Sequence, residues 1–155
     1  MTAKEVNDIL TSFLSLKSPP YDKPNQSDWQ FLKSKFKCDF ANDLILFYEY
    51  IGNYRFFGEL LGVVRLGNIF TRDTISVVYD HEMTNGAWPS SMIPFYSIGN
   101  GDYICFSVLL GQHSPIYYVN HEDDQLYIDP ENAELEEIYS DFSAWIRDCK
   151  TYIGD

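Results

Sequence analysis

The chain has few cysteines, no long apolar run and almost no basic residues in its second half. Its cysteines, Cys38, Cys105 and Cys149, are widely spaced and form no C-x-x-C pair, so neither a disulfide framework nor a zinc ribbon is indicated. No uncharged apolar stretch is long enough to span a membrane, and no basic segment followed by an apolar one opens the chain. We therefore expect a cytoplasmic protein that has no signal peptide and no membrane span.

Motifs for catalysis, metal binding and phosphate binding are missing or incomplete. Residues 81–85 begin like the zinc motif H-E-x-x-H, but Asn85 replaces the second histidine. Residues 99–104 begin like G-x-G-x-x-G, but Ile104 replaces the third glycine, which favours a turn over a phosphate loop. Residues 121–124 (HEDD) could bind a hard cation, but they lack the glycine and the alternating ligands of a calcium loop. We predict no enzyme, no catalytic residue, no metal site and no cofactor.

The charge is distributed unevenly along the chain. Residues 1–77 hold 9 acidic and 9 basic side chains, whereas residues 78–155 hold 14 acidic and 2 basic ones. Such an acidic half would repel phosphates, so direct nucleic-acid binding is not expected. It favours a basic protein partner that is drawn in by long-range attraction, although a solvated acidic surface with no partner would show the same composition.

Hydrophobic spacing predicts helices towards both ends of the chain. Apolar residues recur at steps of three and four through residues 6–14. Residues 27–30 (SDWQ) fit a capping box that starts a second helix. A third helix is expected from about Asn42 to Gly52, with Gly52 as a left-handed cap, and Ser140 is expected to cap the last helix. The large apolar residues on these and neighbouring elements that should lie in the core are Trp29, Phe47, Phe95 and Trp145.

Short strands are predicted in the middle of the chain. Residues 92–98, 103–108 and 115–119 are apolar runs separated by turns, and glycines at 99 and 101 allow the chain to reverse. Residues 54–58 and 60–66 are expected to form a strand pair, and residues 125–129 another short strand. Residues 71–85 fit either strand or helix. The fold class that follows is α+β, a mainly antiparallel central sheet flanked by N-terminal and C-terminal helices, in a single domain spanning 1–155.

The order of these segments resembles that of the SUKH superfamily, which includes many bacterial immunity proteins and a fungal cell-wall regulator. The matching elements are Trp88-Pro89, Ile93-Pro94-Phe95, the turn at residues 99–102, the helix at residues 40–52 and Phe142-x-x-Trp145. The chain departs from the usual pattern at Ala41, where members carry Pro, and at Ile51, where they carry Asn. The resemblance covers roughly residues 29–149 and favours helix for residues 71–85.

The resemblance implies a SUKH-like immunity protein that binds a cognate, basic toxin such as a nuclease and occludes its active surface. The alternative within the same superfamily is a cytoplasmic regulatory or scaffold module that binds another protein. The candidate partner-binding residues are Asp80, Glu82, Trp88, Asp102, Glu122, Asp123 and Asp124. For Asp102 the other interpretation is that its carboxylate satisfies backbone donors in its turn, and residues 122–124 are expected at a charged hairpin tip.

Overall fold

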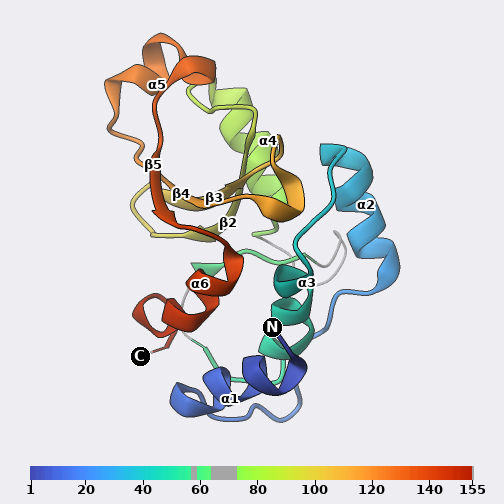
Figure 1. Ribbon diagram of the computed structural model, residues 1–155. Helices are drawn as coiled ribbons and strands as arrows, with labels where there is room; N and C mark the ends of the chain where they lie inside the picture. Colours follow the sequence, from blue (N-terminus) through green and yellow to red (C-terminus); the bar gives the residue numbers. More distant parts are fainter. Residues whose placement is uncertain (57–58, 64–72, 155) are drawn as a thin grey trace.

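The computed structural model describes residues 1–56, 59–63 and 73–154, and its centre is a five-stranded antiparallel sheet (Figure 1). The strands lie side by side in chain order, so each is the neighbour of the next. They are β1 (Glu59–Leu60), β2 (Met92–Ser97), β3 (Tyr103–Ser107), β4 (Ile116–Val119) and β5 (Glu136–Tyr139). The expected α+β class with a mainly antiparallel sheet is confirmed.

Helices precede the sheet, interrupt it and close the chain. They are α1 (Ala3–Phe13), α2 (Gln26–Phe36), α3 (Asn42–Ile51), α4 (Ile75–Asn85), α5 (Asp124–Ile128) and α6 (Phe142–Asp148). α1, α3 and α6 pack against one another, whereas α5 lies at the opposite end of the molecule from α1 (Figure 1). No helix in the described residues is long and apolar enough to cross a membrane.

The two faces of the sheet bury two separate groups of side chains. Ile104 and Phe106 on β3 point into the main core, which also contains buried residues of α1, α3 and α6. Cys105, the residue between them, points to the other face and packs with Leu126 of α5 in a smaller core. Successive side chains of a strand alternate between faces, so a short apolar strand can serve both cores. The smaller core determines where α5 sits.

A bulge lies in β2 at Phe95. The register of β2 against β3 shifts between Pro94 and Tyr96. Proline has no N–H to donate to a neighbouring strand and is confined to strand edges, strand starts and bulges. Phe95 is fully buried at this position and lies 5.0 Å from the ring of Trp145. The irregularity therefore lets β2 keep a proline while it anchors α6.

The prediction of four large core residues is confirmed for three of them. Phe47, Phe95 and Trp145 have no exposed side-chain surface. Trp29 is only half-buried and packs on the rim of the core, with its ring 5.9 Å from that of Phe40. The helix favoured for residues 71–85 is confirmed over Ile75–Asn85, where α4 begins after Thr74, whose hydroxyl accepts from the Val77 N–H at 3.2 Å. Residues 71–72 of that prediction lie outside the described residues.

Two predicted strand assignments are wrong. Residues 125–128 belong to α5 and Asp129 is its C-cap, because the Asp123 side chain accepts from the Gln125 N–H and starts a helix. The expected pairing of residues 54–58 with 60–66 is replaced by pairing of β1 with β2, while Tyr54 bridges Leu16. Residues 57–58 and 64–66 of that prediction lie outside the described residues. The strand β5, rich in glutamate, was not predicted at all.

Three predicted helix caps are also wrong. The capping box of α2 is formed by Asn25 and Asp28 rather than by Ser27 and its partner. Asp141, not the preceding serine, caps α6. Gly52 has right-handed backbone angles, and the feature that requires glycine is a close approach, because a Cβ there would lie 3.2 Å from the Tyr21 carbonyl oxygen.

Candidate functional site

The helix α5 and the segments that flank it in the sequence are acidic, with Glu122, Asp123, Asp124, Asp129 and Glu131. Asp80 on α4 pairs with Lys35 of α2 at 2.7 Å. Within the described part of the chain, no Lys or Arg side chain forms an ion pair with a carboxylate between residues 122 and 148. The negative charge at this end is therefore left for solvent or a partner.

A buried carboxylate organises the loop that leads into α5. Asp102 is 5% exposed, and its Oδ1 accepts from the backbone N–H of His121 at 2.9 Å and faces the His121 Nδ1 at 2.5 Å. Its Oδ2 accepts from the Tyr118 hydroxyl at 2.5 Å. Asp102 thus joins the turn before β3, the end of β4 and the loop after β4.

The ionisation of this cluster follows from its contacts. Burial alone would raise the pKa of Asp102, but the hydrogen bonds from Tyr118 and His121 outweigh it and lower that pKa. The hydrogen bond to Asp102 raises the pKa of His121 above its ordinary value. Burial, together with Asp102, raises the pKa of Tyr118 to about 12. Asp102 is therefore an anion at neutral pH and accepts hydrogen bonds from both neighbours.

A cavity of about 240 Å³ opens beside this cluster. It lies between α4, the turn before β3 and α5. Trp88, Val119 and Leu126 give it apolar walls, and Glu82 and His121 give it polar groups. The Tyr103 hydroxyl donates to Glu82 at 3.4 Å, and burial followed by the charge of Glu82 raises the pKa of Tyr103 to about 12.

α5 presents two exposed apolar side chains at the acidic end. Tyr127 is 65% exposed and Ile128 is 82% exposed. The carboxylates of Asp124 and Asp129 flank them in the sequence, and the Tyr127 hydroxyl donates to the His121 carbonyl at 3.0 Å. Aromatic and aliphatic anchors with a polar rim are the usual anatomy of a protein-binding surface.

The predicted partner-binding residues fall into distinct environments. Trp88 and Asp102 are buried, and the Trp88 indole N–H donates to the Met92 carbonyl at 2.9 Å. A partner could reach Trp88 only through the cavity that it lines. The interpretation of Asp102 as an exposed contact is wrong, because its carboxylate is buried against His121 and Tyr118. A role of Trp88 or Asp102 in partner binding stays a prediction. Asp102 does bind backbone, but that of His121 rather than donors of its own turn.

The remaining candidates lie around α4 and α5. Glu82 lines the cavity, and Glu122 and Asp124 are exposed. Asp123 caps α5, so residues 122–124 form a helix start and not the tip of a hairpin. The structure brings Glu82 and Glu122 close to His121, whereas Asp80 is held by Lys35.

Sequence reasoning missed His121, Tyr127 and Ile128 as surface groups. His121 was considered only as a ligand for a cation, and residues 125–129 were assigned to a strand. The signal that could have revealed the helix is the aspartate pair at 123 and 124, because Asp is favoured at the N-cap and in the first turn. The exposure of Tyr127 and Ile128 follows only from that helix.

The three thiols are poor nucleophiles. Burial raises the pKa of Cys105 well above its ordinary value and that of Cys149 to about 12. Burial and the nearby Asp39 also raise the pKa of Cys38. The thiolate is the reactive form of cysteine, so the surroundings of all three thiols disfavour that form. Across the described ranges, no three His, Cys, Asp or Glu side chains are grouped so as to hold a metal ion.

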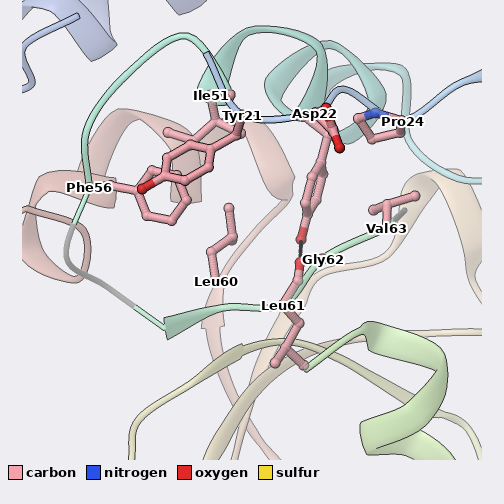
Figure 2. A pocket seen from close by; sticks show the side chains of 11 residues that line it. Tyr21, Asp22, Pro24, Ile51, Phe56, Leu60, Leu61, Gly62 and Val63 are labelled. Atoms are coloured by element: carbon pink, nitrogen blue, oxygen red, sulfur yellow. Dashed lines mark hydrogen bonds between the residues drawn. The ribbon is translucent and has the colours of Figure 1, made fainter. Parts of the chain in front are cut away.

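A second cavity, of about 330 Å³, lies between the end of α3, the loop before α2 and the chain around β1. Figure 2 shows Tyr21 and Phe56 side by side at one wall, with Asp22 and Pro24 at the other. The ring centroids of Tyr21 and Phe56 are 5.3 Å apart. The Tyr48 hydroxyl donates to the Leu61 carbonyl at 2.6 Å across it. None of the predicted partner-binding residues lines this cavity.

The fold defines a class of small α+β domain with a five-stranded antiparallel sheet. The model of the SMI1 / KNR4 family (SUKH-1) matches residues 23–148, and the chain belongs to this family. A crystal structure of a protein from Pseudomonas syringae pv. tomato has the same fold, with a TM-score of 0.61 and 14% sequence identity, over 94% of this chain and 96% of that one. Among curated proteins, none matches the chain.

Proposed function

We propose that this protein is a bacterial immunity protein that binds a basic toxin in the cytoplasm and occludes its active surface. The observation that carries the proposal is the exposed pair Tyr127 and Ile128 on α5 within an acidic surface. Among the described residues, the carboxylates between residues 122 and 148 form no ion pair with Lys or Arg. Membership of the SMI1 / KNR4 family supports a protein-binding role of this kind. In this proposal the protein acts by binding rather than by catalysis, and the chain acts as a single domain.

Each part of the surface has a physical role in this proposal. Buried apolar anchors supply most of the binding energy of an interface, and a surrounding ring of polar groups excludes water. Ile128 and Tyr127 are placed to be such anchors. The carboxylates of Glu122, Asp124 and Asp129 would steer a basic partner towards them. A toxin that binds nucleic acid carries the basic groove that this surface complements.

The test begins with capture of the partner and ends with a toxicity assay. The chain is purified from the cell that makes it, the bound protein is identified by mass spectrometry, and that protein is produced alone and together with this chain. We expect the captured protein alone to stop growth and co-production to restore it. A harmless captured protein would favour the regulatory or scaffold alternative and contradict the proposal.

Matched variants locate the interface. Ile128→Asp places a charge at the proposed anchor and should abolish protection. Leu109→Asp makes the same change at a side chain that is 80% exposed in the loop after β3, and it should protect like the unmodified chain. Equal protection by both variants would move the interface away from α5.

A further inference from the structure

The cavity beside His121 is too small for a typical cofactor and has the right chemistry for one long side chain. Its volume of about 240 Å³ lies below the roughly 300–1,000 Å³ of small-molecule sites. Trp88, Val119 and Leu126 form an apolar wall that can bury a hydrocarbon stem. The ionisable groups that line it are Glu82, His121 and Tyr127.

Glu82 supplies a carboxylate without a cation. It lies on α4, is half-buried, and accepts a long hydrogen bond from Tyr103 at 3.4 Å, its only one from the described part of the chain. No Lys, Arg or His forms an ion pair with it within the described residues. A carboxylate on an apolar wall favours a ligand with a hydrocarbon stem and a positive head group.

His121 is held so that its second nitrogen can accept a hydrogen bond. Asp102 is an acceptor, so the His121 Nδ1 carries the proton that lies between them, and in the neutral ring Nε2 is an acceptor. The ring packs on Gly101, where φ is +100° and a Cβ would lie 3.0 Å from the His121 Cγ. Any larger residue at 101 would displace the ring from this position.

We propose that this cavity takes a single lysine or arginine side chain of the protein partner, and that its entry is coupled to loss of a proton from His121. The inference deepens the proposed function and rests on it, because the partner there is a basic protein. The stem lies against Trp88 and Leu126, and the cationic head lies between Glu82 and the Nε2 of His121. A protonated His121 repels the same head group.

The direction of the pH dependence follows from the groups that face His121. These are Asp102 from the turn before β3, Glu82 from α4 and Glu122 from its own loop, and Tyr118 reaches it through Asp102. The acidic neighbours raise the pKa of His121, so the ring is positive below that pKa and neutral above it. A lysine amine stays charged to about pH 10. Binding of the cation should therefore strengthen as the pH rises through the pKa of His121.

The experiment uses the intact chain and a small probe, so it does not depend on the partner. Nα-acetyl-lysine N-methylamide is titrated into ¹⁵N-labelled protein at pH 5.5 and 8, with Nα-acetyl-norleucine N-methylamide as the uncharged match. We expect the lysine probe to shift the signals of the Trp88 indole and of the Gly101 and His121 amides. We also expect the probe to bind more tightly at pH 8 than at pH 5.5. Glu82→Gln should weaken its binding about fivefold, whereas Glu134→Gln, which removes the same charge outside the cavity, should not.

Several results would overturn the inference. Equal shifts with both probes would make the cavity a merely apolar pocket, and no shift at all would make it a packing defect. Binding that is equal at both pH values would remove the coupling to His121. The toxicity assay is independent of this titration, so loss of the cavity site and loss of the immunity role give different results.

Discussion

Asp102 holds the loop before α5 through the backbone and the ring of His121. Replacing it with Asn keeps the size of the side chain but removes the negative charge that His121 faces at 2.5 Å. The pKa of His121 should then fall towards 6.5, because that charge and hydrogen bond are what raise it. A pH titration of the His121 ring protons by NMR measures the change. An unchanged His121 pKa would mean that Asp102 does not hold the ring.

The same substitution should change how stability depends on pH. His121 has a raised folded-state pKa, so its contribution is complete below about pH 6.5 and is lost as the pH rises through that pKa. The folded-state pKa of Asp102 is lowered, so the contribution of Asp102 to stability is present above about pH 3.8 and is lost as the pH falls through that folded-state pKa. The melting temperature of Asp102→Asn should therefore lie furthest below that of the unmodified chain between about pH 4 and pH 6.5. A constant difference across pH would contradict this.

Trp145 contributes through its volume rather than through its polar atom. It is fully buried and lies 5.5 Å from the Phe47 ring, and in the described residues its Nε1 has no hydrogen-bond partner. Trp145→Ala should lower the free energy of unfolding by about 3–5 kcal/mol. Trp145→Phe should cost clearly less, because it also removes an unsatisfied buried donor. Urea unfolding of both variants measures this, and equal losses would contradict a contribution through side-chain volume.

At the scale of the element, α5 depends on its cap because it is only five residues long. Asp123→Ala removes the acceptor of the Gln125 N–H and should destabilise the helix by about 0.5–2 kcal/mol. Glu122→Gln removes an equal charge from the neighbouring exposed residue and should leave α5 intact. Amide hydrogen exchange of Leu126 reports the difference, and equal exchange in both variants would exclude the cap. The acidic run at residues 122–124 therefore combines one capping residue with two exposed ones.

The strand β5 shows how an acidic element can complete a sheet. It pairs with β4 through Glu136 and Glu137 and leaves its other edge without a partner strand in the described sheet. Charged residues on an edge strand discourage pairing with a second molecule. Because of its glutamates, β5 shows no apolar alternation in the sequence. The same glutamates suit its position at the edge of the sheet.

For the whole molecule, the uneven charge predicts how a partner arrives. The second half of the chain carries 14 acidic and 2 basic residues. If a basic partner binds this end, its association rate should fall steeply between low salt and about 0.5 M salt, because the Debye length shrinks from about 30 Å at 0.01 M to about 3 Å at 1 M. The dissociation rate should change less. Surface plasmon resonance at several salt concentrations measures both, and an association rate independent of salt would exclude charge steering.

Much of the fold could be predicted from local pattern. β2, β3 and β4 are apolar runs between glycine turns, and Gly99 and Gly101 do have positive φ. α1 and α3 follow from helical spacing. The failures are β5 and α5, where side chains are charged or only one residue is buried, so no apolar periodicity marks the element. The caps failed because several polar residues compete at each helix start, and only the backbone geometry selects one.

The sequence by itself determined the fold class, the family, the three central strands and the acidic character of the second half, because these depend on composition and on neighbours along the chain. Only the tertiary structure decided which acidic residues are free. It buried Asp102 against His121 and Tyr118, which are 19 and 16 residues away, and paired Asp80 with Lys35, 45 residues away. Such contacts form when distant segments pack, and no local pattern records them. The cavity beside His121 and the exposed face of α5 exist for the same reason.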